Sequence, residues 1–142
     1  VQPAPELLLA IDGHEVARLR FRTGARPQAA AAVECLRAAG IPTFLVSSAS
    51  DTDAAELAGR LGADFSGGDL DPAGRIRFLR GLRRRGVRPV YVGNLAARPE
   101  LAREAHVAVA AGGLDGHEIV GDLVLLGSCY GNLADLFALA RG

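Results

Sequence analysis

The 142-residue sequence contains no lysine, no methionine and no tryptophan, and all 16 of its basic residues are arginine. Without lysine, the chain can form no Schiff base and has no phosphate-binding lysine of the P-loop type. Any phosphate binding must therefore use arginine or backbone N–H groups. A GC-rich genome explains this arginine bias without a functional role. Because the chain has no initiator methionine, we expect it to be a fragment, an excised domain or a processed product.

Cysteine is scarce, and long apolar runs and net charge are absent. Cys35 and Cys129 stand far apart without other ligands at metal-binding spacing, and they fit no disulfide framework. No apolar run approaches the roughly 18 residues of a membrane helix, and no signal peptide is recognisable. The 16 basic and 16 acidic residues give a formal net charge of +0. We expect a soluble, cytoplasmic protein without direct membrane insertion.

The composition is that of a globular protein, with 49% hydrophobic and 23% charged residues. We assign residues 1–142 to a single domain, with a lead-in at 1–22 and an α/β core at 23–142. In the lead-in, Asp12-Gly13 stands between a mostly apolar run at 6–11 and a run at 16–22 that alternates apolar residues with arginine. This pattern predicts a β-hairpin whose second strand has one solvated face.

The rest of the chain alternates between strand-like runs and helical periodicity. This order predicts an α/β fold of three Rossmann-like layers, a mostly parallel sheet flanked by helices, with the site at the carboxyl ends of the strands. Asp51 is expected to cap the second helix, which ends at Gly62, and residues 65–71 are expected to form a loop. The predicted strands are 42–46, 89–92, 106–110 and 122–126, and the other predicted helices are 27–39, 72–85, 98–105 and 132–141.

The loops at the predicted carboxyl ends are residues 47–50, 93–98 and 111–116. Ser47 and Ser48 come between a strand and a helix, where free amides and the helix dipole favour an anion. Serines at such turns also serve as ordinary helix caps. The residues alone leave both interpretations open.

The order of several short motifs is informative. Arg26-Pro27 opens a helix, and the next strand ends in Val46-Ser47-Ser48-Ala49. Residues 90–101 read Val-Tyr-Val-Gly-Asn-Leu-Ala-Ala-Arg-Pro-Glu-Leu, and residues 106–110 and 113–126 follow before a last helix. Over nearly the whole chain, these segments resemble the phosphorylation domain of P-type ATPases in the haloacid dehalogenase-like superfamily. The resemblance implies that superfamily's fold, nucleotide binding, and Mg²⁺-dependent ATP hydrolysis coupled to cation transport through an aspartyl-phosphate.

The sequence departs from the family at the positions that the resemblance assigns to chemistry. Nothing in it matches the phosphorylated Asp-Lys-Thr-Gly-Thr motif. The Thr/Ser-Gly-Asp motif is replaced by residues 47–49, and the motif lysine corresponds to Arg75. In the magnesium loop, Asn94 replaces the first aspartate, and the second falls on Arg98 or, with the gap placed earlier, on Ala97. No metal-binding carboxylate survives in either alignment, so we expect no cofactor, including Mg²⁺.

The resemblance and these departures together imply a catalytically degenerate module that is not an enzyme as this chain. Its role would be structural, regulatory or protein-interacting. Its partners would be other domains of a larger membrane ATPase-like protein, or a separate protein. The alternative is a divergent phosphohydrolase or ATPase domain that still binds phosphate or nucleotide. The positions that would bind phosphate or another anion are Ser47, Ser48, Arg75, Asn94 and Arg98.

Other residues offer weaker candidates. Asp12 ends an apolar run, as the nucleophile of this superfamily does, but His14 stands where a second aspartate is required. His106 and His117 lie on separate segments. The arginines between 75 and 88 fit an anionic partner or simply a solvated helix face, and with only Phe78 among them we expect no nucleic acid binding.

The missing first motif also has a structural consequence. In the family, the strand that carries it lies in the middle of the sheet. Its absence predicts a rearranged strand order or a strand supplied by a partner. Unpaired strand edges also favour edge-to-edge association, so a homo-oligomer is a further expectation.

Overall fold

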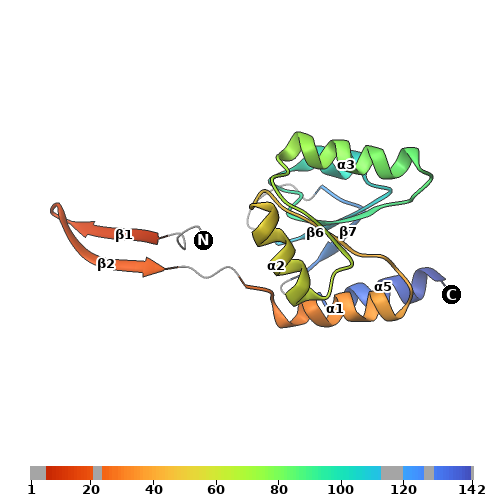
Figure 1. Ribbon diagram of the computed structural model, residues 1–142, viewed down its shortest axis with the longest axis horizontal. Helices are drawn as coiled ribbons and strands as arrows, with labels where there is room; N and C mark the ends of the chain where they lie inside the picture. Colours follow the sequence, from red (N-terminus) through yellow and green to blue (C-terminus); the bar gives the residue numbers. More distant parts are fainter. Residues whose placement is uncertain (1–5, 21–23, 113–119, 127–129, 142) are drawn as a thin grey trace.

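The computed structural model describes residues 6–20, 24–112, 120–126 and 130–141 (Figure 1). It confirms the α/β class, with parallel strands connected by helices and an antiparallel hairpin at the N-terminal end. The elements are β1 (Glu6–Ile11), β2 (His14–Arg20), α1 (Pro27–Ala38), β3 (Phe44–Val46), α2 (Asp51–Leu61), β4 (Phe65–Gly67), α3 (Pro72–Arg84), β5 (Val90–Gly93), α4 (Pro99–Glu104), β6 (Val107–Ala111), β7 (Leu123–Leu125) and α5 (Asn132–Arg141).

The predicted hairpin is present, and its second strand spans His14–Arg20; residues 21 and 22 of the predicted strand lie outside the described residues. Asp12 and Gly13 have φ values of 51° and 78°, the left-handed conformation that a two-residue type I′ turn requires. The prediction that the second strand has one solvated face was wrong, because Leu19 lies on the face of β2 opposite its arginines and is also exposed. In Figure 1 the hairpin stands apart from the α/β body, and none of the described helices covers either of its faces.

The parallel strands form two sheets instead of the single predicted sheet. One contains β3 and β4, and the other has the order β5-β6-β7. The predicted loop at 65–71 contains β4, which pairs with β3 from Phe44↔Phe65 to Val46↔Gly67. A three-residue strand shows no periodicity in a sequence, and only this long-range pairing defines it. Among the described residues, no strand joins β3 to β5.

Strand β6 lies at the centre of the larger sheet and is covered on both faces, as is typical of parallel strands. Its side chains alternate between two apolar clusters. Val109 and Ala111 pack with residues of α1 and α5, whereas Ala108 and Ala110 pack with residues of α3 and α4. Figure 1 shows α3 on one side of β6 and β7, and α1 with α5 on the other. These are the outer layers of the predicted three-layer arrangement.

Polar side chains cap the first turns of α2 and α3. The N-cap of α2 is Ser50, whose hydroxyl accepts a hydrogen bond from the N–H of Asp53 at 3.1 Å, so the prediction of Asp51 as the cap was wrong by one residue. Asp71 caps α3 by accepting from the N–H of Gly74 at 2.6 Å. At the other end, α2 stops at Gly62, as predicted.

A carboxylate joins the starts of β3 and β4. Asp64 accepts hydrogen bonds from the Thr43 N–H at 2.7 Å and from the Thr43 hydroxyl at 2.9 Å. The Thr43 backbone oxygen in turn accepts from the N–H groups of Asp64 and Phe65. The hydrogen bond from the Thr43 backbone, followed by that from its hydroxyl, holds the pKa of Asp64 below its usual value. This pair sets the register of the smaller sheet.

Candidate functional site

The five predicted site residues lie at or near the carboxyl ends of the strands. Ser47 and Ser48 follow β3, Asn94 follows β5, Arg98 precedes α4, and Arg75 lies in the first turn of α3. Ser47 and Arg75 are half-buried, and the other three are exposed. Among the described residues, no hydrogen bond or ion pair joins any two of these five side chains.

Ser47 is held by both of its backbone groups and by its side chain. Its N–H donates to Gly67 at 2.9 Å, and its backbone oxygen accepts from Leu70 at 2.9 Å. The hydroxyl oxygen accepts from the N–H of Ala49 at 3.1 Å, which closes a local turn. The hydroxyl proton remains available to donate to an anion. This is the one feature of the Ser47 side chain that suits a phosphate site.

The amino terminus of α2 already has acceptors from the chain itself. The Asp69 carboxylate accepts from the N–H of Asp51 at 3.3 Å, and Ser50 accepts from Asp53. The Asp51 carboxylate accepts from the N–H of Gly68 at 2.8 Å, which closes the loop onto the helix. A helix amino terminus attracts anions. At α2, carboxylates of the chain itself lie beside that terminus. The sequence analysis did not predict the role of Asp69. The Gly-Gly-Asp loop that carries it could have indicated this role, but the loop follows a strand too short to recognise.

The loop after β5 does not suit a divalent cation. The side-chain oxygen of Asn94 accepts from the N–H of Ala97 at 3.1 Å and thus serves a turn. Arg98 occupies the N-cap of α4 and contributes a positive charge there. Mg²⁺ needs carboxylate oxygens, and a neighbouring guanidinium repels it. The residues of this loop therefore do not fit the magnesium ion that the family resemblance implies. In the described ranges, no three His, Cys, Asp or Glu side chains gather as metal ligands.

Arg75 faces a different feature. Its Nε donates to the backbone oxygen of Leu70 at 3.2 Å, and none of the described carboxylates forms an ion pair with it. The Arg75 side chain lines a cavity of about 620 Å³. A guanidinium with this placement can offer its remaining N–H groups to an oxygen acceptor in the cavity.

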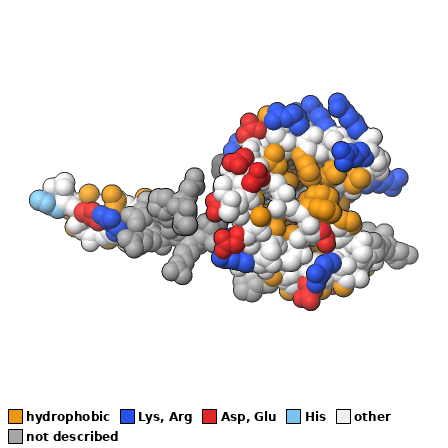
Figure 2. All heavy atoms as spheres, in the orientation of Figure 1, with side chains coloured by type: hydrophobic (Ala, Val, Ile, Leu, Met, Phe, Trp, Pro, Cys, Tyr) orange, Lys and Arg blue, Asp and Glu red, His pale blue; other side chains and the backbone are white. Residues whose placement is uncertain are grey.

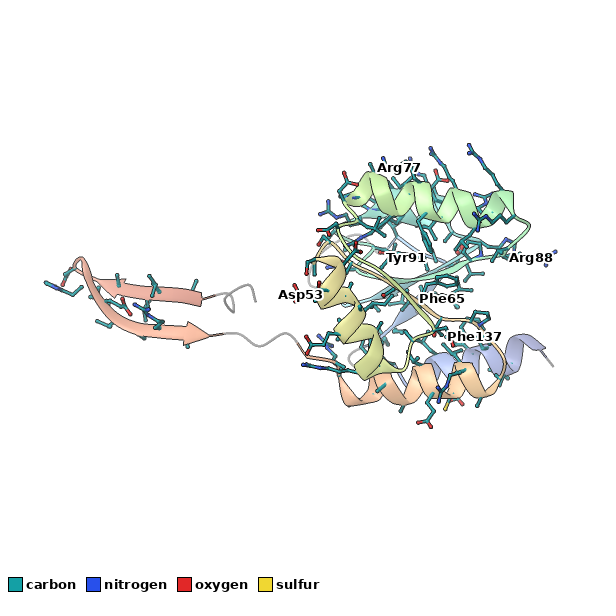
Figure 3. All side chains as sticks on the ribbon, viewed as in Figure 1. Asp53, Phe65, Arg77, Arg88, Tyr91 and Phe137 are labelled. Carbon is teal, nitrogen blue, oxygen red and sulfur yellow. The ribbon has the colours of Figure 1, made fainter. Side chains whose placement is uncertain are left out.

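This cavity lies between the two sheets, and we call it the inter-sheet slot. It is lined by β3 and β5 together with side chains of α1, β4, α3 and α5. Figure 3 shows Phe65, Tyr91 and Phe137 lying in the space between α3 and α1, and Figure 2 shows a hydrophobic surface in the same place. The slot is partly open to solvent, so it is a groove rather than a closed void.

The remaining candidates do not join this region. Asp12 and His14 lie in the hairpin, His106 is exposed just before β6, and Cys35 is an exposed free cysteine of α1. The predicted loop residues beyond Gly112, with His117 and Cys129, fall outside the described residues.

The arginines of α3 form an exposed basic surface, seen along the top of Figure 2. Two of them have acidic partners: Arg80 donates to Glu104 at 2.5 Å, and Arg77 lies 4.0 Å from Asp71. None of the described helices combines the length and the apolar character that a membrane span requires.

Comparisons with known proteins agree on the architecture. No family profile matches the chain. Nitrogen fixation protein FixI of Rhizobium leguminosarum bv. viciae is 35% identical over 109 residues, which are 76% of this chain and 14% of that relative's length. Among solved structures, a zinc-transporting PIB-type ATPase in its E2.Pi state has a TM-score of 0.73 at 22% identity, over 94% of this chain and 22% of that chain.

Two other solved structures extend the comparison. The catalytic CPx-ATPase domain CopB-B has a TM-score of 0.69 at 22% identity, over 91% of this chain and 52% of that chain. A 3-deoxy-D-manno-octulosonate 8-phosphate phosphatase from Yersinia pestis has a TM-score of 0.65 at 14% identity, over 95% and 74% of the two chains. This chain therefore has the haloacid dehalogenase-like fold, in the form that the catalytic domains of P-type ATPases have.

Proposed function

We propose that this chain is a catalytically degenerate phosphorylation-domain module whose role is structural, regulatory or protein-interacting. The observation that supports this proposal is the chemistry of the loop after β5, where an amide and a guanidinium replace the carboxylates that the resemblance implies. Asn94 serves a local turn, and Arg98 brings a positive charge. Phosphoryl transfer in this superfamily needs a metal to offset phosphate charge, and this loop has no anionic ligand for one.

The module is proposed to be one part of a larger, cation-transporting ATPase-like protein. In that protein it would lie on the cytoplasmic side of the membrane. The similarity to short portions of longer proteins supports this, since the chain matches 14% of FixI and 22% of the zinc-transporting ATPase. The whole protein would then supply the domains that this module contacts. Within it, residues 1–142 would form a single domain with the hairpin as its lead-in.

Calorimetric titration of Mg²⁺ into the full chain, with inorganic phosphate present, tests the loss of metal binding. We expect no saturable Mg²⁺-dependent heat. The double variant Asn94→Asp with Arg98→Asp restores two carboxylates and is expected to gain weak Mg²⁺ binding, whereas Gln28→Asp on exposed α1 is a control that gains none. Saturable Mg²⁺ binding by the unchanged chain would contradict the proposal.

A second function is a metal-free anion site for phosphate or nucleotide, formed by Ser47, Ser48, Arg75, Asn94 and Arg98. The observation that favours it is the absence of ion pairs to Arg75 and Arg98 among the described carboxylates, together with the free hydroxyl proton of Ser47. Titration with ATP in the absence of metal tests this function. Binding should weaken steeply with salt and with Arg98→Glu but not with Arg103→Glu, because screening removes contacts of this kind.

A further inference from the structure

Helix α3 and the turn that follows it carry charge of one sign only. Residues 72–88 contain seven of the 16 arginines of the chain and none of its 16 acidic residues. A solvated helix face in a chain without net charge ordinarily carries both signs, in pairs three or four positions apart. The positive charge of α3 is therefore concentrated beyond what the composition of the chain requires.

The packing of α3 fixes where its arginines lie. Its apolar residues belong to the cluster that packs against β6. Arg77, Arg80 and Arg84 follow one another at spacings of four and three residues or their sum, so they form one row on the side away from that cluster. Arg83 and Arg85 are exposed at the end of the helix. We call these five arginines the α3 basic face, which occupies the upper edge of the molecule in Figure 2.

One carboxylate of helix α4 neutralises part of this face. Arg80 donates a hydrogen bond to Glu104 at 2.5 Å. This hydrogen bond, together with the charges of Arg80 and Arg83, holds the pKa of Glu104 below its ordinary value. A single carboxylate between two guanidinium groups still leaves a net positive charge at this place.

The rest of the face has little or no compensation. Arg77 lies 4.0 Å from Asp71, and because both side chains are largely exposed, their attraction is weak. Among the described residues, no ion pair includes Arg84 or Arg85. The negative end of the helix dipole favours a cation in the last turn, but three adjacent arginines also repel one another. An anionic partner would relieve this repulsion.

The shape of the face favours a flat partner. Helix α3 has 13 residues, is about 20 Å long, and lies at the outer edge of the body in Figure 1. The outer side of a helix is convex, whereas most peptide ligands bind in grooves or along strand edges. A membrane leaflet is flat, and each guanidinium can bind a separate lipid phosphate on it. Because the apolar residues of α3 are used in the core, none of them is left to enter the bilayer.

We propose that the α3 basic face binds the anionic headgroups of a membrane leaflet, by contact of its guanidinium groups with lipid phosphates and carboxylates and without insertion into the hydrocarbon core. This inference rests on the proposed place of the module at the cytoplasmic side of a membrane protein, where the leaflet carries anionic lipids. The loop after β5 takes no part in it, so it does not depend on the loss of metal ligands.

The test is co-sedimentation of the full chain with vesicles of roughly one-third phosphatidylserine in phosphatidylcholine, in about 0.1 M salt. We expect binding at least about tenfold stronger than to vesicles of phosphatidylcholine alone. Binding should disappear in about 1 M salt, where charges are screened beyond about 3 Å. Absence of binding at the lower salt, or binding that survives the higher salt, would overturn the proposal.

A pair of matched double variants assigns the binding to this face. Arg84→Gln with Arg85→Gln should weaken it roughly 25-fold, because each arginine near an anionic surface contributes roughly a factor of five. Arg37→Gln with Arg60→Gln removes the same charge from exposed positions of α1 and α2 and should weaken it by less than about threefold. Equal losses would overturn the proposal, since total charge rather than the α3 basic face would then govern binding. Circular dichroism melts verify that both variants keep the fold.

Two further measurements separate this contact from other kinds. Gadolinium-bearing lipid in the vesicles should broaden the NMR signals of residues 83–85 and leave those of α1 unchanged, whereas broadening centred on β1 and β2 would overturn the proposal in favour of the exposed apolar hairpin. Saturable binding of polyglutamate or duplex DNA without vesicle binding would overturn it in favour of that partner. The Mg²⁺ titration contains no lipid, so the two proposals fail separately.

Discussion

A few residues that differ from the family's motifs account for most of the proposed loss of catalysis. Arg75 keeps the positive charge of the lysine that the family resemblance places there, so the absence of lysine is the mildest departure. Asn94 and Arg98 are more severe, because they replace anionic oxygens by an amide and a cation. The loss of metal ligands, rather than the lack of lysine, therefore decides the proposed function.

Asp64 predicts a specific acid sensitivity. Its pKa is lowered by the hydrogen bonds from Thr43, so its contribution to stability is present above its unfolded pKa and is lost as the pH falls through the lower folded pKa. Asp64→Asn should lower the melting temperature at pH 7 and flatten its decline below about pH 4. Thermal melts from neutral to acid pH check this, with exposed Glu34→Gln as the control. An unchanged acid profile in Asp64→Asn would contradict the assignment.

Gly68 is predicted to be intolerant of any side chain. A Cβ added there would lie 2.4 Å from the backbone nitrogen of Asp51, so Gly68→Ala must move the loop or the start of α2. We expect a loss of roughly 1–3 kcal/mol in the free energy of unfolding. Gly59 lies within α2, and a Cβ added there would have nothing within 4 Å. Gly59→Ala should therefore raise the free energy of unfolding by up to roughly 1 kcal/mol. Chemical denaturation of both variants decides it, and a neutral Gly68→Ala would show that the contact is not as close as described.

At the scale of elements, the short helix α4 depends on its packing. Six residues are too few for a stable isolated helix, so α4 is held by Leu101, which is 0% exposed. We expect Leu101→Ala to cost about 2–5 kcal/mol. Leu139→Ala, on the exposed side of α5, should cost far less. Urea denaturation compares the two, and equal effects would show that α4 is not anchored by this side chain.

The sequence predicted the elements whose signals are local and missed those defined by distant pairing. The type I′ turn at Asp12-Gly13 and the helix from Pro72 follow from residues within a few positions of one another. Strand β4 and the division into two sheets depend on which strands meet, and no local pattern carries that information. The same holds for Asp69, whose carboxylate reaches the start of α2 from 18 positions away. The positions of Ser47 and Asn94 were predictable because each directly follows a strand.

At the scale of the whole molecule, the hairpin and the α/β body are expected to respond independently. The hairpin stands apart from the body in Figure 1, and Leu9 is exposed on it. Leu9→Lys should therefore change the unfolding free energy of the body by less than about 0.5 kcal/mol. The NMR chemical-shift changes that this substitution causes should be confined to β1 and β2. Shifts in β3 or β5 would show instead that the hairpin contacts the slot.

At the scale of the whole molecule, the inter-sheet slot separates the sheet of β3 and β4 from the sheet of β5, β6 and β7. The loop that follows β3 and the loop that follows β5 therefore leave from different sheets.

The most direct test of the central claim is steady-state hydrolysis of ATP and p-nitrophenyl phosphate by the full chain with saturating Mg²⁺. We expect rates equal to those of a buffer blank and of the variants Ser47→Ala and Asp12→Asn. Mg²⁺-dependent turnover that either variant abolishes would contradict it and would show that the domain retains a working phosphoryl-transfer site.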